Sequence, residues 1–153
     1  MKISDSASVA NTDVSPLATI TADHVFIGVD NYDVMKRWYI ENLDFTVDKE
    51  WIVDELPGMK LAYLRKGDFR LELIGDDQGP RTPIPADFVE HLKSKGFQHL
   101  AFRVDSVDAV MAELKKRGID AFVPAASYEN VGRRVSFIKD PEGNVVEFAQ
   151  DLE

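Results

Sequence analysis

The feature that most constrains this chain is an internal repeat with a period of 75 residues. His24 and Asp30 recur as His99 and Asp105. A glutamate follows each of these histidines at the same spacing, because Glu72 and Glu147 are also 75 positions apart. Repeats of this length indicate a fold built from copies of one supersecondary unit. We therefore expect two curved sheets, each flanked by a helix, that meet around a shared cleft.

The first half of the chain predicts one strand, one helix and three further strands. Residues 24–29 form a short β-rich run, and Asp30 and Asn31 are good N-caps for a helix over 32–43. Turn-like stretches that each contain a glycine separate the β-type segments that follow. These segments are 45–53, 60–66 and 69–75.

The second half repeats this order. Residues 99–104 read as a strand, and Ser106 can cap a helix that ends at Gly118. An apolar stripe at helical spacing supports that helix, and it consists of Val107, Val110, Met111 and Leu114. Three β-type segments follow at 119–124, 133–139 and 144–150. The fold class is therefore α+β, with two βαβββ modules.

Composition changes along the chain set the expected boundaries. Residues 1–21 are rich in Ser, Thr, Ala and Asp and show no sustained period, which indicates a disordered tail. The first module then covers 22–84 and the second 97–153. Between them, Pro85 and Gly96 suit the first turn and the end of a linker helix over 85–96.

Charge and cysteine content exclude several classes of function. The net charge of −9 argues against a nucleic-acid or anionic-membrane surface. With no cysteine, the chain has no disulfide, thiolate metal ligand or cysteine nucleophile. No apolar run approaches the roughly 18 residues of a membrane span, and no secretory signal begins the sequence. We expect a cytoplasmic protein.

Strand periodicity places the repeated histidines and glutamates on one side of each sheet. In the strand 24–29, His24 points away from the aliphatic residues that face the helix, and in 69–75 Glu72 does the same. His99 and Glu147 repeat this arrangement. Two imidazoles and two carboxylates that meet in the cleft would form an N2O2 set suited to a divalent first-row metal. The modules are thus expected to form curved sheets around a metal-binding cleft.

These segments also carry a family resemblance. The chain resembles the vicinal oxygen chelate superfamily over residues 22–151. The resemblance lies in the starts of the two modules, DHVFIGVDN and QHLAFRVDS, and in their ends, FRLELIG and FIKDPEGNVVEFAQ. That superfamily includes glyoxalase I, methylmalonyl-CoA epimerase, extradiol dioxygenases, fosfomycin-resistance enzymes and bleomycin-resistance proteins. The resemblance implies a Ni, Co, Mn, Fe or Zn ion. Its implied ligands are His24, Glu72, His99 and Glu147. A His/Glu/His/Glu set is similar to that of nickel- or cobalt-activated bacterial glyoxalases.

The sequence departs from those glyoxalases at three places. Gly28 stands where they usually carry an arginine for glutathione, which leaves the use of glutathione open. Asp44 occupies a position where glycine is usual. The loop SYENVGRRVSF replaces their glycine-rich loop and looks more like that of dioxygenase-like or epimerase-like members.

The resemblance and the ligand set together suggest a function. We expect a metal-dependent isomerase, epimerase or glyoxalase-type lyase that acts on a small α-carbonyl or vicinal-oxygen substrate through an enediolate-like intermediate. Glu147 and Glu72 are the expected proton-transfer groups. One alternative is an Fe(II) dioxygenase that uses His24, His99 and Glu147. The other is a non-catalytic drug- or metabolite-binding protein of the bleomycin-resistance type.

The remaining expectations concern the substrate and the partner. Arg133 and Arg134 are candidates for binding a substrate carboxylate or phosphate at the mouth of the cleft. His91 has no counterpart in the repeat and is expected to be solvated. We expect a homodimer. Each module offers half of the ligand set, and the sequence does not decide whether two modules are joined within one chain or across a pair of chains.

Overall fold

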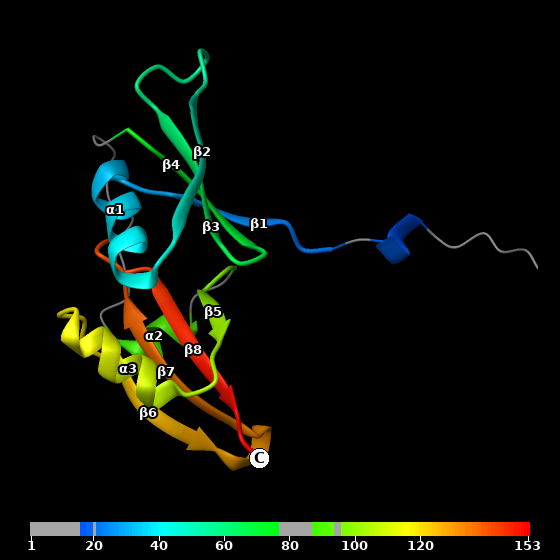
Figure 1. The fold of residues 1–153 in the computed structure, drawn as a ribbon, viewed down its shortest axis with the longest axis vertical. Coiled ribbons are helices and arrows are strands. Elements are labelled where there is room, and N and C mark those ends of the chain that lie inside the picture. The colour runs from blue at the N-terminus through cyan, green and yellow to red at the C-terminus, as the bar shows by residue number, and fades with distance from the viewer. Residues whose placement is uncertain (1–15, 20, 77–86, 94–95) are drawn as a thin grey trace, which may run out of the picture.

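The first module is a four-stranded sheet with one helix, in the order that the sequence predicts. The computed structural model describes residues 16–19, 21–76, 87–93 and 96–153 (Figure 1). The module consists of β1 (His24–Gly28), α1 (Tyr32–Leu43), β2 (Thr46–Ile52), β3 (Lys60–Lys66) and β4 (Phe69–Gly75). Its strand order is β1-β4-β3-β2, in which β1 runs parallel to β4 and the other pairs are antiparallel.

The second module repeats this topology with strand order β5-β8-β7-β6. It consists of β5 (His99–Arg103), α3 (Val107–Lys116), β6 (Val123–Tyr128), β7 (Arg133–Lys139) and β8 (Val145–Asp151). Again the first strand is parallel to the last, and the others are antiparallel. The α+β fold of two βαβββ modules is confirmed, but the two sheets do not close on each other around a single cleft.

Two short helices lie outside the modules. A 3-10 helix (η1, Pro16–Thr19) precedes β1, and α2 (Phe88–Lys93) connects the modules. The linker helix that the sequence predicts over 85–96 is thus seen as six residues, and part of the predicted range lies outside the described residues.

Side chains cap both long helices as predicted. The side chain of Asn31 accepts a hydrogen bond from the Val34 amide at the start of α1. Ser106 does the same for Ala109 at the start of α3. These caps satisfy amides that have no partner within the helix.

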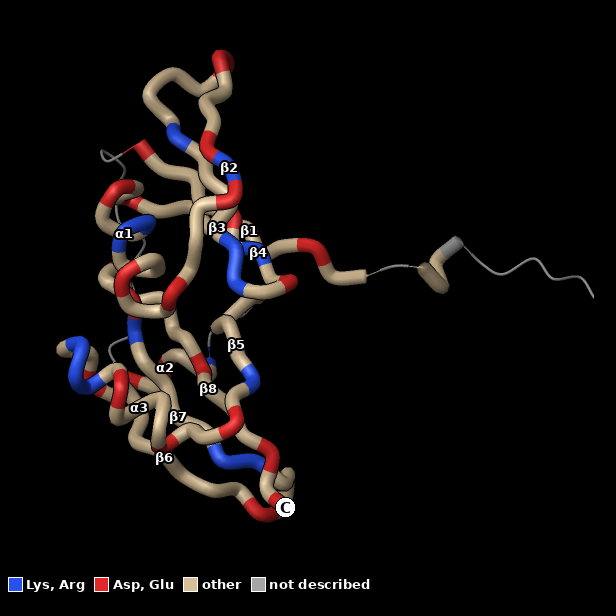
Figure 2. Tube along the Cα trace, in the orientation of Figure 1, with Lys and Arg blue, Asp and Glu red and all other residues tan. Residues whose placement is uncertain are grey.

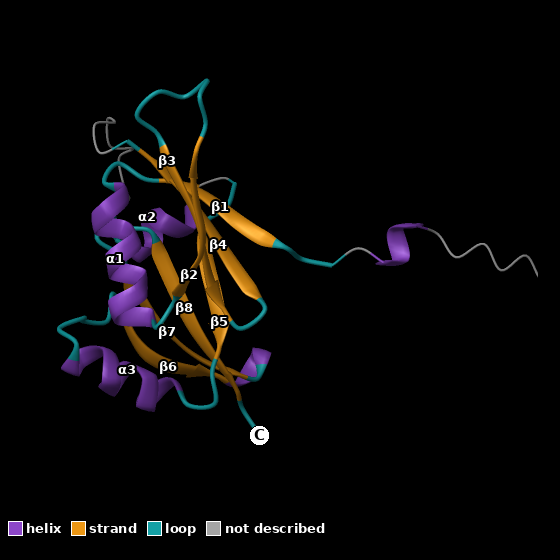
Figure 3. Ribbon diagram, turned by 45° about the horizontal axis from the view of Figure 1, so that its top comes forward, coloured by secondary structure: helices purple, strands orange, loops and turns teal. Residues whose placement is uncertain are grey.

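One hydrophobic core joins the two modules. It combines Tyr39 and Leu71 of the first module with Leu114 and Val146 of the second, all of them buried. Strand alternation supplies this core, because every second side chain of each sheet points toward α1 or α3. These two helices lie on the same side of the molecule (Figure 3). The opposite face of each sheet is therefore left for the His and Glu side chains.

Charged residues of both signs are distributed along the elements (Figure 2). Many of them pair across neighbouring strands, as Arg65 does with Asp48 at 3.0 Å. Within the described ranges, no helix is long and apolar enough to cross a membrane.

Deleting Met1–Leu17 is expected to leave the melting temperature within about 2 °C of the wild type. The described part of this segment is the first half of η1, which lies apart from both modules (Figure 1), and Leu17 is 72% exposed. Thermal unfolding and metal titration of the truncated chain test this expectation. A large loss of stability or of metal affinity would show that the tail packs on the fold.

Candidate metal centre

In the first module, strand pairing brings His24 next to Glu72. The parallel register of β1 and β4 aligns His24 with Arg70 and Phe26 with Glu72, so the histidine and the glutamate are diagonal neighbours on one face. The His24 Nε2 atom lies 3.0 Å from Glu72 Oε2. The two side chains are 32% and 12% exposed, which leaves room for a ligand on the imidazole side.

Two further side chains hold this pair in place. The other ring nitrogen of His24, Nδ1, lies 2.7 Å from Asp23 Oδ2, and this contact lowers the pKa of Asp23. Tyr63 is the cross-strand partner of Glu72, and desolvation together with the negative charge of Glu72 raises the pKa of Tyr63. A carboxylate that orients the second nitrogen of a histidine is a recurrent feature of metal sites in proteins.

The second module forms an equivalent pair. The register of β5 and β8 aligns His99 with Val145, so Glu147 is again the diagonal neighbour. The distance from His99 Nε2 to Glu147 Oε2 is 3.0 Å, with the side chains 26% and 17% exposed. Phe137, the cross-strand partner of Glu147, places its ring 5.6 Å from the His99 ring. We call the faces that carry His24 with Glu72 and His99 with Glu147 the ligand faces.

The helix α2 packs on the ligand face of the second module. Phe88 contacts the Phe137 ring at 4.7 Å, and His91 lies between Phe88 and His99. His91 is only 6% exposed, so the expectation that it is solvated is wrong. Burial lowers the pKa of His91, and its electrostatic interaction with His99 is the next cause, which favours the neutral form of His91.

The two pairs do not meet within the described part of a single chain. No three His, Cys, Asp or Glu side chains among the described residues are close enough together to hold a metal ion. The reason is the packing of the modules, which join through the core beneath α1 and α3 rather than through the ligand faces. The described part of each chain therefore presents two separate His–Glu pairs, which we call the half-sites.

Each half-site is a direct His–Glu ion-pair contact whose spacing is also compatible with two ligands of one divalent metal. Two ligand atoms that each lie about 2.1 Å from one ion, at right angles, are about 3 Å apart. The Nε2–Oε2 distance is 3.0 Å in both modules. Neutral imidazole and carboxylate are also the nitrogen and oxygen ligands that Ni, Co, Mn, Fe and Zn accept. Two such half-sites would supply four ligands and leave coordination positions for a substrate.

The two candidate arginines lie on opposite faces of β7. Arg134 points toward α3 and binds both carboxylate oxygens of Asp108, at 2.7 and 3.0 Å. Its predicted place at the cleft mouth is therefore wrong, because alternate residues of a strand face opposite ways. Arg133 shares the ligand face with Phe137 and pairs with Asp151 at 2.7 Å.

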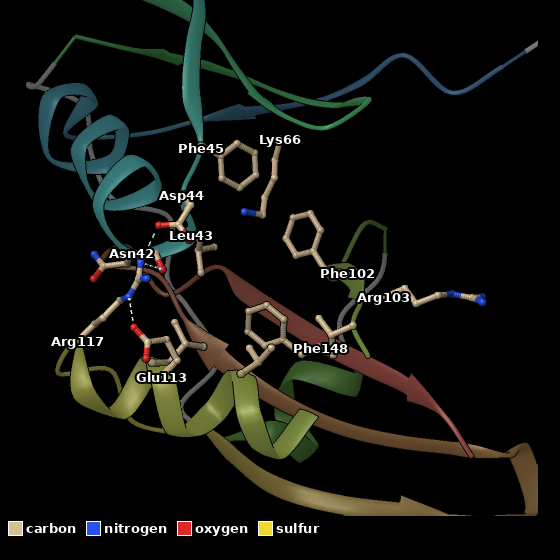
Figure 4. A pocket seen from close by; sticks show the side chains of 13 residues that line it. Asn42, Leu43, Asp44, Phe45, Lys66, Phe102, Arg103, Glu113, Arg117 and Phe148 are labelled. Atoms are coloured by element: carbon tan, nitrogen blue, oxygen red, sulfur yellow. Dashed lines mark hydrogen bonds and ion pairs between the residues drawn. The ribbon is translucent and has the colours of Figure 1, made fainter. Parts of the chain in front are cut away.

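A separate cavity of about 380 Å³ lies between the modules on their helix side (Figure 4). Its lining includes the rings of Phe45, Phe102 and Phe148. None of the four candidate metal ligands lines it. This cavity is thus a gap in the packing between the modules and is distinct from the half-sites.

The repeat and the topology define a class of two-module α+β protein with one His–Glu pair on the sheet of each module. Residues 21–148 match the model of the Glyoxalase/Bleomycin resistance protein/Dioxygenase superfamily. The chain belongs to this superfamily.

Individual relatives agree with this assignment. The crystal structure of a glyoxalase family protein from Enterococcus faecalis superposes with a TM-score of 0.72 at 30% identity, covering 86% of this chain and 98% of that one. The uncharacterized protein YwkD of Bacillus subtilis is 29% identical over 78% of this chain and 88% of its own length. Methylmalonyl-CoA epimerase of Mus musculus is 28% identical over 84% of this chain and 71% of its own length.

Sequence reasoning missed three residues of the half-sites. Asp23 had a visible signal, since it is an acidic residue directly before the first repeated histidine. Tyr63 could be found only by knowing that it pairs with Glu72 across β3 and β4. His91 had no local signal, because its burial depends on how α2 folds back onto the sheet.

Proposed function

We propose that this protein is a metal-dependent isomerase, epimerase or glyoxalase-type lyase that acts on a small α-carbonyl or vicinal-oxygen substrate. The observation that carries the proposal is the repeat-related pair of half-sites, in which His24–Glu72 and His99–Glu147 have the same 3.0 Å geometry. Some relatives of this chain are named as enzymes, among them methylmalonyl-CoA epimerase. A binding protein without a metal would not need four such ligands.

We further propose that a second copy of the chain completes each metal site. Among the described residues, each half-site of one chain brings two candidate ligands together, so His24–Glu72 would be completed by the His99–Glu147 half-site of a partner. Exposed apolar side chains near the half-sites support this pairing. Phe26 on the first ligand face is 51% exposed, and Phe97, just before β5, is fully exposed. A protein–protein contact would remove both from water.

The chain's own residues suit a proton transfer. A divalent ion, when bound, supplies Lewis-acid stabilisation for negative charge on a substrate oxygen. Glu147 would remove a proton from the carbon next to the substrate carbonyl, and the C–H electron pair would move toward the carbonyl oxygen to give an enolate, or an enediolate where that carbon carries a hydroxyl. Glu72 of the second chain, which would enter this step protonated, would then return its proton to carbon, with Tyr63 as its cross-strand neighbour. Arg133 is the candidate for binding a substrate carboxylate.

A solvent-exchange experiment tests the proposed reaction. The metal-loaded protein is incubated in D2O with a panel of α-hydroxy-carbonyl compounds and acyl thioesters that carry an acidic α-proton. We expect deuterium at the α-carbon of at least one compound, detected by NMR, and loss of that exchange in Glu147→Gln. Oxygen uptake with Fe(II) but no exchange would instead assign the protein to the dioxygenases. Tight binding of a compound without metal and without exchange would indicate a binding protein.

A further inference from the structure

The two long helices are capped in different ways, although the modules are repeats. The amide of Val107 at the start of α3 donates to Gln150 Oε1 of its own module, at 3.0 Å. The residue 75 positions earlier is Gly75, which has no side chain. A Cβ atom there would lie 2.5 Å from the carbonyl oxygen of Val29. The first module therefore has no equivalent of this cap.

The second module instead contacts two other amides at the start of α1. Glu142, in the turn between β7 and β8, accepts hydrogen bonds from the amides of Asp30 and Asn31, at 2.9 and 2.7 Å. Both carboxylate oxygens are used. A negative charge at this end of a helix is also favoured by the helix dipole.

Buried contacts fix the turn that carries Glu142. Asp140, only 4% exposed, accepts hydrogen bonds from the amides of Glu142 and Asn144, at 3.0 and 2.9 Å. The hydroxyl of Tyr39, in the middle of α1, donates to the same carboxylate at 2.9 Å. The turn is thus held to α1 by two separate side chains.

The second module also contacts the other end of α1. Arg117 donates to the carbonyls of Glu41 and Asn42, at 3.2 and 3.3 Å, and to the Asp44 carboxylate at 2.8 Å. Asp44 has a positive φ of 54°, which exposes these last carbonyls at the end of the helix. Positive charge is favoured here for the same electrostatic reason. The bonds of Glu142 and Arg117 to α1 are called the cross-module contacts below.

We propose that Glu142 and Arg117 are positioning residues that set the angle between the two ligand faces of one chain. Asp30 lies two residues after β1, which carries His24, and Glu142 lies three residues before β8, which carries Glu147. The cross-module contacts therefore connect the strands of the two half-sites. This role rests on the proposed function: in a symmetric dimer, both half-sites of each chain must meet their partners at once, so the angle decides whether both metal sites form.

A distance measurement tests the positioning itself. Because the chain has no cysteine, Arg37→Cys on α1 and Ala112→Cys on α3 allow two spin labels, one in each module. The labelled chain is diluted with unlabelled chain, and the label–label distance is measured by pulsed electron paramagnetic resonance. We expect a narrow distribution that broadens or shifts in Glu142→Ala, and more so in Glu142→Ala/Arg117→Ala. Gln150→Ala removes a helix cap within one module and is the matched control, so its distribution should stay narrow.

Metal affinity supplies the second readout. At a temperature where all variants are folded, Glu142→Ala should bind Ni²⁺ at least about tenfold more weakly than Gln150→Ala, even where their melting temperatures are equal. Glu142→Gln keeps one acceptor oxygen and should fall between Glu142→Ala and the wild type, and it replaces Glu142→Ala if that variant does not fold. An unchanged distance distribution in the double variant would overturn the proposal. If the wild type binds no metal, the proposed function fails, while the distance measurement still decides the positioning role.

Discussion

Replacing His99 with alanine is expected to weaken divalent-metal binding by at least about 100-fold. The substitution removes one of the four proposed ligands, and even substitutions of residues that only support the ligands of metal sites commonly cost about 10–100-fold in affinity. The fold should tolerate the loss of His99, because its side chain is partly exposed. The substitution also removes the 3.0 Å contact of its Nε2 atom with Glu147. Isothermal titration with Ni²⁺ or Co²⁺ measures the effect, and circular dichroism checks that the variant is folded.

The neighbouring helix offers a matched control for the glutamate ligands. Glu90 is an exposed glutamate on α2 that pairs with Lys93, so Glu90→Gln should bind metal as the wild type does. Glu72→Gln and Glu147→Gln should each weaken binding. Wild-type affinity in His99→Ala would exclude the second half-site as a source of ligands.

Mixing two defective variants is expected to restore metal sites. His24→Ala and Glu147→Ala each damage both sites of a homodimer in which half-sites are shared between chains. In a mixed dimer, one site carries both lesions and the other carries none. Random pairing makes about half of the dimers mixed, so refolding the two variants together should recover about a quarter of the wild-type sites.

One outcome of this mixing experiment would contradict the sharing of sites between chains. If each site forms within one chain, every chain in the mixture carries a lesion and no tight site returns. Refolding each variant separately and then combining the products without exchange is the control. A monomer by analytical ultracentrifugation at micromolar concentration would also reject sharing between chains.

Helix-capping residues and apolar periodicity predicted most helices and strands of this fold, because interactions between residues close in sequence determine them. Asn31 and Ser106 cap the helices that their positions indicated, and the apolar alternation around Glu72 placed it on the face opposite α1. One strand was placed wrongly: the prediction was 119–124, whereas β6 is Val123–Tyr128. The predicted strand begins at the apolar Ile119. Its amide instead donates to the Leu114 carbonyl at the end of α3, and its side chain packs on the core.

The relation between the modules could not be predicted in this way. Periodicity showed that all four ligands point away from the helices, but it does not show whether two sheets of one chain face each other. That relation depends on long-range contacts, such as those of Glu142 with the amides of Asp30 and Asn31. These residues are more than 100 positions apart, and no local sequence pattern links them. The burial of His91 against His99 escaped prediction for the same reason.

Metal binding by the wild-type chain tests the central claim most directly. The protein is stripped with a chelator and dialysed to equilibrium against Ni²⁺, Co²⁺, Mn²⁺, Fe²⁺ or Zn²⁺ in turn, and bound metal is measured by mass spectrometry. The two half-sites with 3.0 Å Nε2–Oε2 distances predict about one tightly bound ion per chain for at least one of these metals. Less than about a tenth of an ion per chain for all five would contradict the assignment of His24, Glu72, His99 and Glu147 as a metal centre.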